Sequence, residues 1–156
     1  MQIGVFMQEK REFRKWEALI AAPLIKEFEG LRLEAYRCPA GVLTIGWGHT
    51  GSDVEFGTRI TAHQADQLLT LDMEKIKKQL IPAIKIAVTA GQFEALISLA
   101  FNVGAGAVIR SKLLSKLNAG HPEEAIKEFD DWNRCNGKVS AGLTRRRKAE
   151  AKVFAS

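Results

Sequence analysis

The pattern of the sequence changes between Leu33 and Ile60, and this stretch constrains the fold more than any other. Five glycines, at positions 41, 46, 48, 51 and 57, separate short apolar pieces such as Val42–Ile45. Short strand-like pieces between glycines are typical of a small, twisted antiparallel sheet, and glycine lets the backbone approach a ligand closely. We therefore expect a small β-containing lobe here.

The chain that follows has helical character and marked helix starts. Thr61 with Gln64 and Thr89 with Gln92 each have the spacing of a capping box, in which a hydroxyl and an amide satisfy free backbone N–H groups. These signals predict helices near residues 61–80, 90–102, 111–118, 122–132 and 142–154. The expected fold class is α+β: a small β-containing lobe and a larger helical lobe, joined by the long helix, with a cleft between them.

The residues before the small lobe predict a helical extension at 1–22. Apolar residues at positions 13, 16, 19 and 20 recur at helical spacing between charged ones. Pro23 then opens the next helix or kinks a continuous one, and that helix is expected to end at Gly30, with Glu29 in its last turn. The domain proper is expected at 23–156, with a small lobe at about 23–60, a linking helix at about 61–80 and a helical lobe at about 81–156.

Composition limits the classes of function. The chain has 156 residues, 46% apolar and 26% charged, which is typical of a soluble globular protein. Its apolar runs fall short of the roughly 18 to 20 residues that span a bilayer, and the charged residues before Trp16 do not suit a signal peptide. We expect synthesis in the cytoplasm without a clear signal peptide, and no stable membrane insertion.

The charge of the chain limits the possible partners. The formal net charge of +5 favours a polyanion, which could be nucleic acid, anionic lipid or an acidic bacterial wall, and charge alone does not choose among them.

The two cysteines, Cys38 and Cys135, form no disulfide framework, and no Cys/His spacing resembles a zinc site. We expect free thiols, no metal and no cofactor; a bridge between the two would need Cα atoms within about 7 Å.

Three residues at fixed spacing supply a possible chemistry. Glu29, eight residues, Cys38, five residues and Thr44 provide a possible proton donor, a possible base or nucleophile, and a hydroxyl. Hydrolysis of a glycosidic bond needs an acid for the leaving oxygen and a second group that supports a water or a covalent intermediate. Apolar neighbours on both sides of Glu29 would shield a carboxyl from water and help it keep its proton. The alternative interpretation is that Glu29 is an ordinary glutamate on the surface of a helix.

The residues around these positions resemble the phage-type lysozymes, the endolysins of glycoside hydrolase family 24. The stretches FEGLRLEAY and GVLTIGWGHTG, with a cysteine between them, match the family motif of Glu, eight residues, Asp or Cys, five residues and Thr. Similarity continues through Ala100–Gly104 to Gly142–Arg147, so that it covers roughly residues 24–154. Many relatives have aspartate where this chain has Cys38.

The resemblance implies a muramidase for host cell lysis. Such an enzyme hydrolyses the β-1,4 bond between N-acetylmuramic acid and N-acetylglucosamine and reaches the periplasmic or wall peptidoglycan after release. Glu29 would be the general acid, and Thr44 and Cys38 would support the attacking water. We expect a monomer whose partner is the peptidoglycan glycan strand, and no nucleic acid partner.

The same resemblance adds four residues to the site. Thr50 and Phe101 would contact the sugar, His49 would make a structural hydrogen bond, and Arg146 would pair with Glu29. A thiol with a pKa near 8.5 is only a few per cent ionised at neutral pH, so Cys38 would need help from a cation, with Arg37 as a candidate. Simpler interpretations are a core residue for Phe101 and a solvated helix for the arginines.

Three other functions compete with hydrolysis. A non-catalytic peptidoglycan-binding protein would bind without cleaving. A cationic membrane-disrupting protein would kill cells without Glu29. A lytic transglycosylase would leave an anhydro-sugar end instead of a reducing end.

Overall fold

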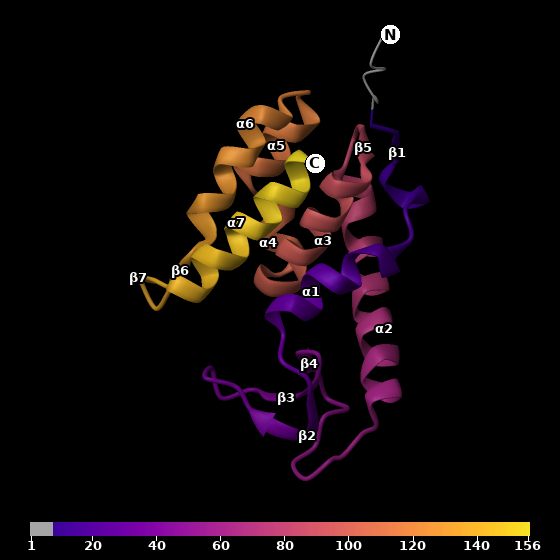
Figure 1. Cartoon of the computed structure of the whole chain (residues 1–156), viewed down its shortest axis with the longest axis vertical. Helices are drawn as coiled ribbons and strands as arrows, with labels where there is room; N and C mark the ends of the chain where they lie inside the picture. Colours follow the sequence, from indigo (N-terminus) through magenta and orange to yellow (C-terminus); the bar gives the residue numbers. More distant parts are fainter. Residues whose placement is uncertain (1–7) are drawn as a thin grey trace, which may run out of the picture.

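The structure is a computed structural model that describes residues 8–156. A small sheet lies at the bottom of Figure 1, the helices cluster at the top, and α2 runs from one to the other. The expected α+β fold with two unequal lobes is therefore confirmed. The helices are α1 (Ala22–Phe28), α2 (Ala62–Leu80), α3 (Ala90–Val103), α4 (Ala105–Ile109), α5 (Lys112–Asn118), α6 (Pro122–Lys127) and α7 (Ala141–Ala155). The strands are β1 (Lys10–Glu12), β2 (Arg32–Arg37), β3 (Leu43–Gly46), β4 (His49–Thr50), β5 (Ala87–Thr89), β6 (Arg134–Cys135) and β7 (Lys138–Val139).

Both predicted capping boxes are present. Thr61 Oγ1 accepts a hydrogen bond from the Gln64 N–H at 3.1 Å, and Gln64 Oε1 accepts one from the Thr61 N–H at 2.8 Å. Thr89 and Gln92 make the same reciprocal pair at the start of α3. These local bonds fix where α2 and α3 begin, because each satisfies N–H groups that the helix itself leaves free.

The small lobe is an antiparallel sheet in the order β2, β3, β4. Tyr36 is paired with Thr44 and Ile45 with His49, and the register between β2 and β3 shifts between Arg32 and Tyr36. Its core is small and consists of Ala35, Ile45 and Val54, with partly buried apolar neighbours. The glycine-rich stretch therefore forms the sheet that its pattern predicted.

The helical lobe has a much larger core, centred on α3. Every residue of α3 from Phe93 to Ala100 is buried except Glu94. A helix that is apolar around most of its circumference must be enclosed by other elements, and α1, α2, α4 and α7 surround α3 in Figure 1. The last helix, α7, packs its buried residues Arg146, Arg147, Glu150 and Phe154 against this core.

The N-terminal segment differs from the expected helical extension. Within the described part, β1 pairs antiparallel with β5, and two short 3-10 turns, Phe13–Lys15 and Ala18–Ala21, lead into α1. Phe13 is buried against Phe93 with ring centroids 4.7 Å apart, and Trp16 Nε1–H donates to the Val88 carbonyl at 3.0 Å. The apolar residues Phe13 and Trp16 do face the core. Residues 10–12 nevertheless form a strand, because the edge of β5 offers backbone hydrogen-bonding partners. Residues 1–7 of the predicted extension lie outside the described residues.

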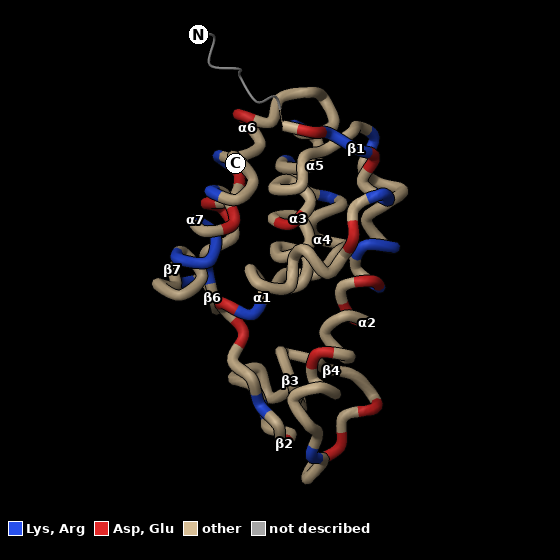
Figure 2. The backbone as a smooth tube through the Cα atoms, turned by 45° about the vertical axis from the view of Figure 1, so that its right-hand side comes forward, with Lys and Arg blue, Asp and Glu red and all other residues tan. Residues whose placement is uncertain are grey.

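Other differences from the predicted elements are small. The short helix α4 follows Gly104 and was not predicted, and the predicted helix at 122–132 continues beyond Lys127 as a 3-10 helix, Glu128–Trp132. A further 3-10 turn, Ile81–Ala83, follows α2. Lys and Arg are spread over both lobes, with several at the start of α7 (Figure 2). Among the helices of residues 8–156, none combines the length and apolarity needed to cross a bilayer.

Candidate active site

Glu29 lies at the junction between α1 and the small lobe. The sequence predicted that this helix ends at Gly30, with Glu29 in its last turn. The helix instead ends at Phe28, and Glu29 has an extended backbone with φ −95° and ψ 124°. Its N–H still donates to the Ile25 carbonyl at 2.9 Å. This change of backbone direction carries the side chain away from the helix, and that side chain is 23% exposed.

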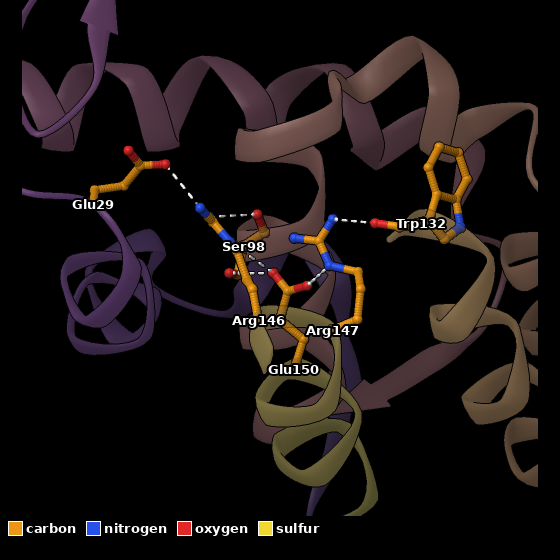
Figure 3. Close-up of polar contacts among 6 residues, drawn as sticks. All are labelled: Glu29, Ser98, Trp132, Arg146, Arg147 and Glu150. Atoms are coloured by element: carbon orange, nitrogen blue, oxygen red, sulfur yellow. Dashed lines mark hydrogen bonds and ion pairs between the residues drawn. The ribbon is translucent and has the colours of Figure 1, made fainter. Parts of the chain in front are cut away.

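Arg146 of α7 holds the Glu29 carboxylate from the helical lobe. Arg146 Nη1 donates to Glu29 Oε1 at 2.8 Å, and Figure 3 shows the two side chains pointing toward each other. The guanidinium is buried, because the Arg146 side chain is only 5% exposed. The predicted pairing is thus present, and it joins residues 117 positions apart in the sequence.

A buried polar network lies behind Arg146, and the sequence did not point to it. Glu150, with no exposed surface, lies between the two arginines (Figure 3): its Oε2 is 3.4 Å from Arg146 Nε, and its Oε1 is 2.6 Å from Arg147 Nε. Ser98 Oγ donates to Glu150 Oε2 at 2.5 Å, and the Ser98 carbonyl accepts from Arg146 Nη2 at 3.2 Å. The spacing of 146, 147 and 150 on one helix face was the only sequence signal for it.

Burial is the largest cause of the pKa shifts of Glu150 and Arg147 in this network. Burial raises the pKa of the Glu150 carboxyl, while Arg147, Ser98 and Arg146 oppose that rise. Burial lowers the pKa of Arg147, against the attraction of Glu150. A neutral Glu150 would leave the buried Arg147 guanidinium without a balancing charge, which is unfavourable in a low dielectric, so we expect Glu150 to be ionised beside Arg147.

Gly48 forms the wall against the other side of Glu29. It has φ +81°, and a Cβ built on it would lie 2.9 Å from Glu29 Oε2 and 3.5 Å from Phe101 Cε1. Both the backbone conformation and the close approach require glycine. The glycine pattern of this stretch did not predict this contact, because the stretch alone does not show where Glu29 lies.

Cys38 and Thr44 lie together on the hairpin that joins β2 and β3. The Cys38 N–H donates to the Val42 carbonyl at 3.0 Å, and the Gly41 N–H donates to the Cys38 carbonyl at 2.7 Å. Thr44 is buried, with Oγ1 donating to the Val42 carbonyl at 3.0 Å. The tight turn therefore fixes the half-buried thiol and the hydroxyl on one small unit of the sheet.

The surroundings of Cys38 lower the pKa of its thiol. The Val42 backbone contributes most, the Ala40 backbone and the Thr44 hydroxyl add to it, and partial burial acts in the opposite direction. Arg37 was one candidate source of this effect, but it is not among the causes, and its Nη1 donates to the Gly41 carbonyl at 3.0 Å. Hydrogen bonds to the charged form lower a pKa even without a neighbouring cation. Cys38 and Cys135 are both free thiols.

Thr50 and Phe101, the two predicted sugar contacts, line one cavity of about 420 Å³ together with Gly48. The other side of this cavity is formed by α2 and the start of α4, including Asp72, Lys75 and Gln79. Backbone, hydroxyl, carboxylate, amine and amide groups therefore surround an aromatic edge, which is a suitable lining for a polar ligand such as a sugar. A larger cavity, of about 670 Å³ between the sheet and α2, is more apolar. Glu29 lines neither cavity; it lies against Gly48, which lines the smaller one.

His49 connects the small lobe to α2 through hydrogen bonds. Its Nδ1 is 2.8 Å from Asp72 Oδ2, and its Nε2 is 2.9 Å from Asp53 Oδ2. Burial lowers the pKa of His49, but Asp72 and Asp53 outweigh it, so that the pKa is raised overall. Both ring nitrogens are engaged, which fits the structural role that was predicted. Within residues 8–156, no group of three or more His, Cys, Asp or Glu residues has the arrangement of a metal site.

A two-lobed α+β fold with a carboxylate held between the lobes defines the lysozyme class of glycoside hydrolases. Residues 26–150 match the family model of the phage lysozymes. The chain belongs to the phage lysozyme family.

Individual relatives agree with this assignment. The chain is 46% identical over 135 residues to the endolysin of Bacillus phage PZA, an alignment that covers 85% of this chain and 52% of that protein. The endolysin from Escherichia coli O157:H7 phage FAHEc1 has a similar structure, with a TM-score of 0.82, 36% identity, and 95% and 96% of the two chains covered. The muramidase domain of SpmX from Asticaccaulis excentricus has a TM-score of 0.80, 39% identity, and coverage of 87% and 95%.

The chain spans about half the length of the curated Bacillus phage relatives that it matches. The matched region therefore has the family and the fold of the phage lysozymes.

Proposed function

We propose that this protein is an endolysin-type muramidase of glycoside hydrolase family 24, with cysteine at the second catalytic position. It hydrolyses the β-1,4 bond between N-acetylmuramic acid and N-acetylglucosamine in peptidoglycan and so causes lysis of the host cell. The observation that carries the proposal is the Glu29 carboxyl, which is held between the lobes by Arg146 and covered by Gly48 beside the cavity of Thr50 and Phe101.

Glu29 acts as the general acid in this proposal. A glycan strand that enters the cavity beside Gly48 and Phe101 brings a glycosidic oxygen to the Glu29 carboxyl, which gives it a proton as the bond breaks. The partial burial of the side chain limits competition from water. Thr50 and Phe101 bind the sugar through its hydroxyl groups and its apolar face.

Cys38 and Thr44 support the attacking water. The Thr44 hydroxyl donates its one proton to the Val42 carbonyl or, when Cys38 is ionised, to the thiolate, and in both cases its oxygen can accept a hydrogen bond from a water. The lowered pKa of Cys38 increases the thiolate fraction at neutral pH, and a thiolate beside the water can take its proton. The two residues together replace the carboxylate that many relatives have at the position of Cys38.

The partner is the glycan strand of peptidoglycan, and the protein acts as a monomer on the periplasmic or wall peptidoglycan after release. The net charge of +5 supports this choice, because acidic groups of a bacterial wall attract a cationic protein. The names of the relatives, endolysin and muramidase domain, support the same substrate.

Mass analysis of the soluble products from purified peptidoglycan tests the proposal. We expect muropeptides with reducing N-acetylmuramic acid ends from the parent protein, and none from Glu29→Gln. Anhydro ends would assign a lytic transglycosylase, and binding without products would assign a non-catalytic wall protein. Killing of cells by Glu29→Gln at the parent level would assign membrane disruption.

A further inference from the structure

Asp66 of α2 joins two side chains that come from other elements. Its Oδ1 accepts a hydrogen bond from Trp47 Nε1–H at 2.9 Å, and Lys26 Nζ lies 2.9 Å from the same oxygen. Lys26 belongs to α1 and Trp47 to the turn between β3 and β4, so three elements meet at one carboxylate near the junction of the lobes (Figure 1). The Lys26 ammonium also lies 5.1 Å from the centroid of the Trp47 ring. The three side chains therefore form one cluster.

The Asp66 carboxyl is ionised in this cluster. The hydrogen bonds from Lys26 and Trp47 lower its pKa, that from Lys26 the most. A hydrogen bond to an ionised acceptor is stronger than one between neutral groups. An exposed ion pair alone contributes little, and Asp66 is 54% exposed, but two donors that share one acceptor restrain each other's positions.

Trp47 and Lys26 are each connected to the candidate site. Trp47 directly precedes Gly48, whose backbone forms the wall against Glu29 Oε2. Lys26 lies in the last turn of α1, three residues before Glu29. Asp66 lines neither the cavity of Gly48 nor the larger cavity between the sheet and α2. Any effect of Asp66 on the reaction must therefore pass through Trp47 and Lys26.

A second contact holds the same turn against α2. Gly46 approaches the buried Ala65 so closely that a Cβ on Gly46 would lie 3.4 Å from the Ala65 Cβ. Gly46 and Trp47 are thus anchored to consecutive residues of α2, one by packing and the other by a hydrogen bond. The turn that carries Gly48 is therefore tied to the helix on one side and faces Glu29 on the other.

We propose that Asp66 is a positioning residue that holds the Gly48 backbone at the distance from Glu29 that the reaction requires. This inference rests on the proposed function. The restraint passes through the Trp47 indole to the wall and through Lys26 to the end of α1. A fixed wall keeps the carboxyl where a glycosidic oxygen can meet it, and such alignment contributes directly to the rate.

The decisive experiment is a double-mutant cycle in kcat between Asp66→Ala and Gly48→Ala. Asp66→Ala alone should lower kcat about fivefold, because the reacting groups lose alignment, whereas KM should change little because the sugar contacts remain. In Gly48→Ala the new methyl group presses on Glu29 as long as the wall is fixed, and loss of the Asp66 restraint lets the wall retreat. The double variant should therefore be no less active than Gly48→Ala alone, whereas independent effects would multiply.

A second cycle tests the path through Trp47. Trp47→Phe keeps an aromatic ring and removes the N–H donor, so it should lower kcat about as much as Asp66→Ala, and the two changes together should lose no more than either alone. Asp66→Asn keeps an oxygen that accepts from the indole and should retain most of kcat. A merely structural Asp66 would lower the free energy of unfolding without this non-additivity in kcat.

Glu34→Ala is the matched control. Glu34 of β2 accepts a hydrogen bond from Arg59 Nη2 at 3.3 Å, so this variant also breaks one exposed ion pair of the small lobe. Within residues 8–156 the Glu34 side chain makes no hydrogen bond or ion pair to Trp47 or Lys26. Its kcat should equal that of the parent. Urea unfolding verifies that every variant is folded before kinetics are measured.

The outcomes separate this inference from the proposed function. If Asp66→Ala keeps the parent's kcat, or if its loss multiplies with that of Gly48→Ala, the inference is overturned even though Glu29→Gln is inactive. If Glu29→Gln retains the parent's activity, the proposed function itself fails. An inactive Glu29→Gln protein together with non-additive losses in both cycles supports both.

Discussion

The two lobes differ in how they are stabilised, and the candidate site lies where they meet. The helical lobe encloses α3 in an extensive apolar core, whereas the buried core of the small lobe consists of Ala35, Ile45 and Val54. Since apolar burial contributes about 25 cal/mol per Å², most of the hydrophobic stabilisation belongs to the helical lobe. The small lobe is instead shaped by glycine turns and backbone hydrogen bonds.

The two lobes also contribute different residues to the site. The hairpin of the small lobe carries Cys38 and Thr44, and the rigid helical lobe contributes Arg146. Elements with few buried contacts open locally at a lower free energy than core elements do. We therefore expect the helical lobe to determine global stability and the small lobe to determine activity, and four experiments test this comparison.

The largest effect is expected from the core of the helical lobe. Phe93 is fully buried and packs on Phe13, so Phe93→Ala should lower the free energy of unfolding by about 3 to 5 kcal/mol. Ile45→Ala in the small lobe should cost about 2 kcal/mol, because the few residues packed around this buried side chain can relax into the space. Urea unfolding followed by circular dichroism measures both values. Equal losses would contradict the proposed difference between the lobes.

The second largest effect concerns Cys38. Cys38→Ala should reduce the rate of peptidoglycan hydrolysis on the order of a hundredfold, because the water loses its base, while Cys38→Asp should retain much of the activity. Thiol-modifying reagents should inactivate the parent and not Cys38→Asp.

The matched control is Cys135→Ala, which removes the exposed thiol of β6. It should be as active as the parent and equally sensitive to thiol reagents. A fully active Cys38→Ala protein would remove Cys38 from the mechanism.

A smaller effect is expected from the wall beside Glu29. In Gly48→Ala the new methyl group would meet Glu29 Oε2 at 2.9 Å, so the carboxyl must move and activity should fall on the order of tenfold. Gly57→Ala is the control, because Gly57 has a similar φ of +85° but nothing within 4 Å of the added Cβ. Both variants should lose similar stability, and only Gly48→Ala should lose activity. Equal activities of Gly48→Ala and Gly57→Ala would show that the close approach of Gly48 to Glu29 does not affect activity.

The smallest effect concerns the link between His49 and Asp72. The pKa of His49 is raised in the folded protein, so its ion pairs stabilise the fold fully below about pH 6.5, the unfolded pKa, and lose this effect as pH rises through the folded pKa. His49→Gln should therefore cost about 1 kcal/mol or less at pH 5.5 and less at pH 8. Urea unfolding at the two pH values measures this, and a cost that grows with pH would have the wrong sign.

Local signals in the sequence predicted much of the fold. The two capping boxes, the glycine-punctuated sheet and the long helix α2 all appear where their patterns placed them. The N-terminal segment was wrongly predicted as a helix, because its apolar spacing says nothing about the free edge of β5. Helical spacing was a correct guide to which side chains face the core there, but not to the backbone conformation.

The sequence by itself determined the family motif, the helix starts and the turns, because each depends on residues within a few positions of one another. Only the tertiary structure decided how the site is assembled. It placed Gly48 against Glu29, replaced Arg37 by backbone groups as the cause of the lowered Cys38 pKa, and buried Glu150 behind Arg146. The contacts of Gly48 and Glu150 join segments that are far apart in the chain or depend on burial, and burial arises only when the lobes pack. The groups around Cys38 are close in sequence, but their positions depend on the turn that the hairpin adopts.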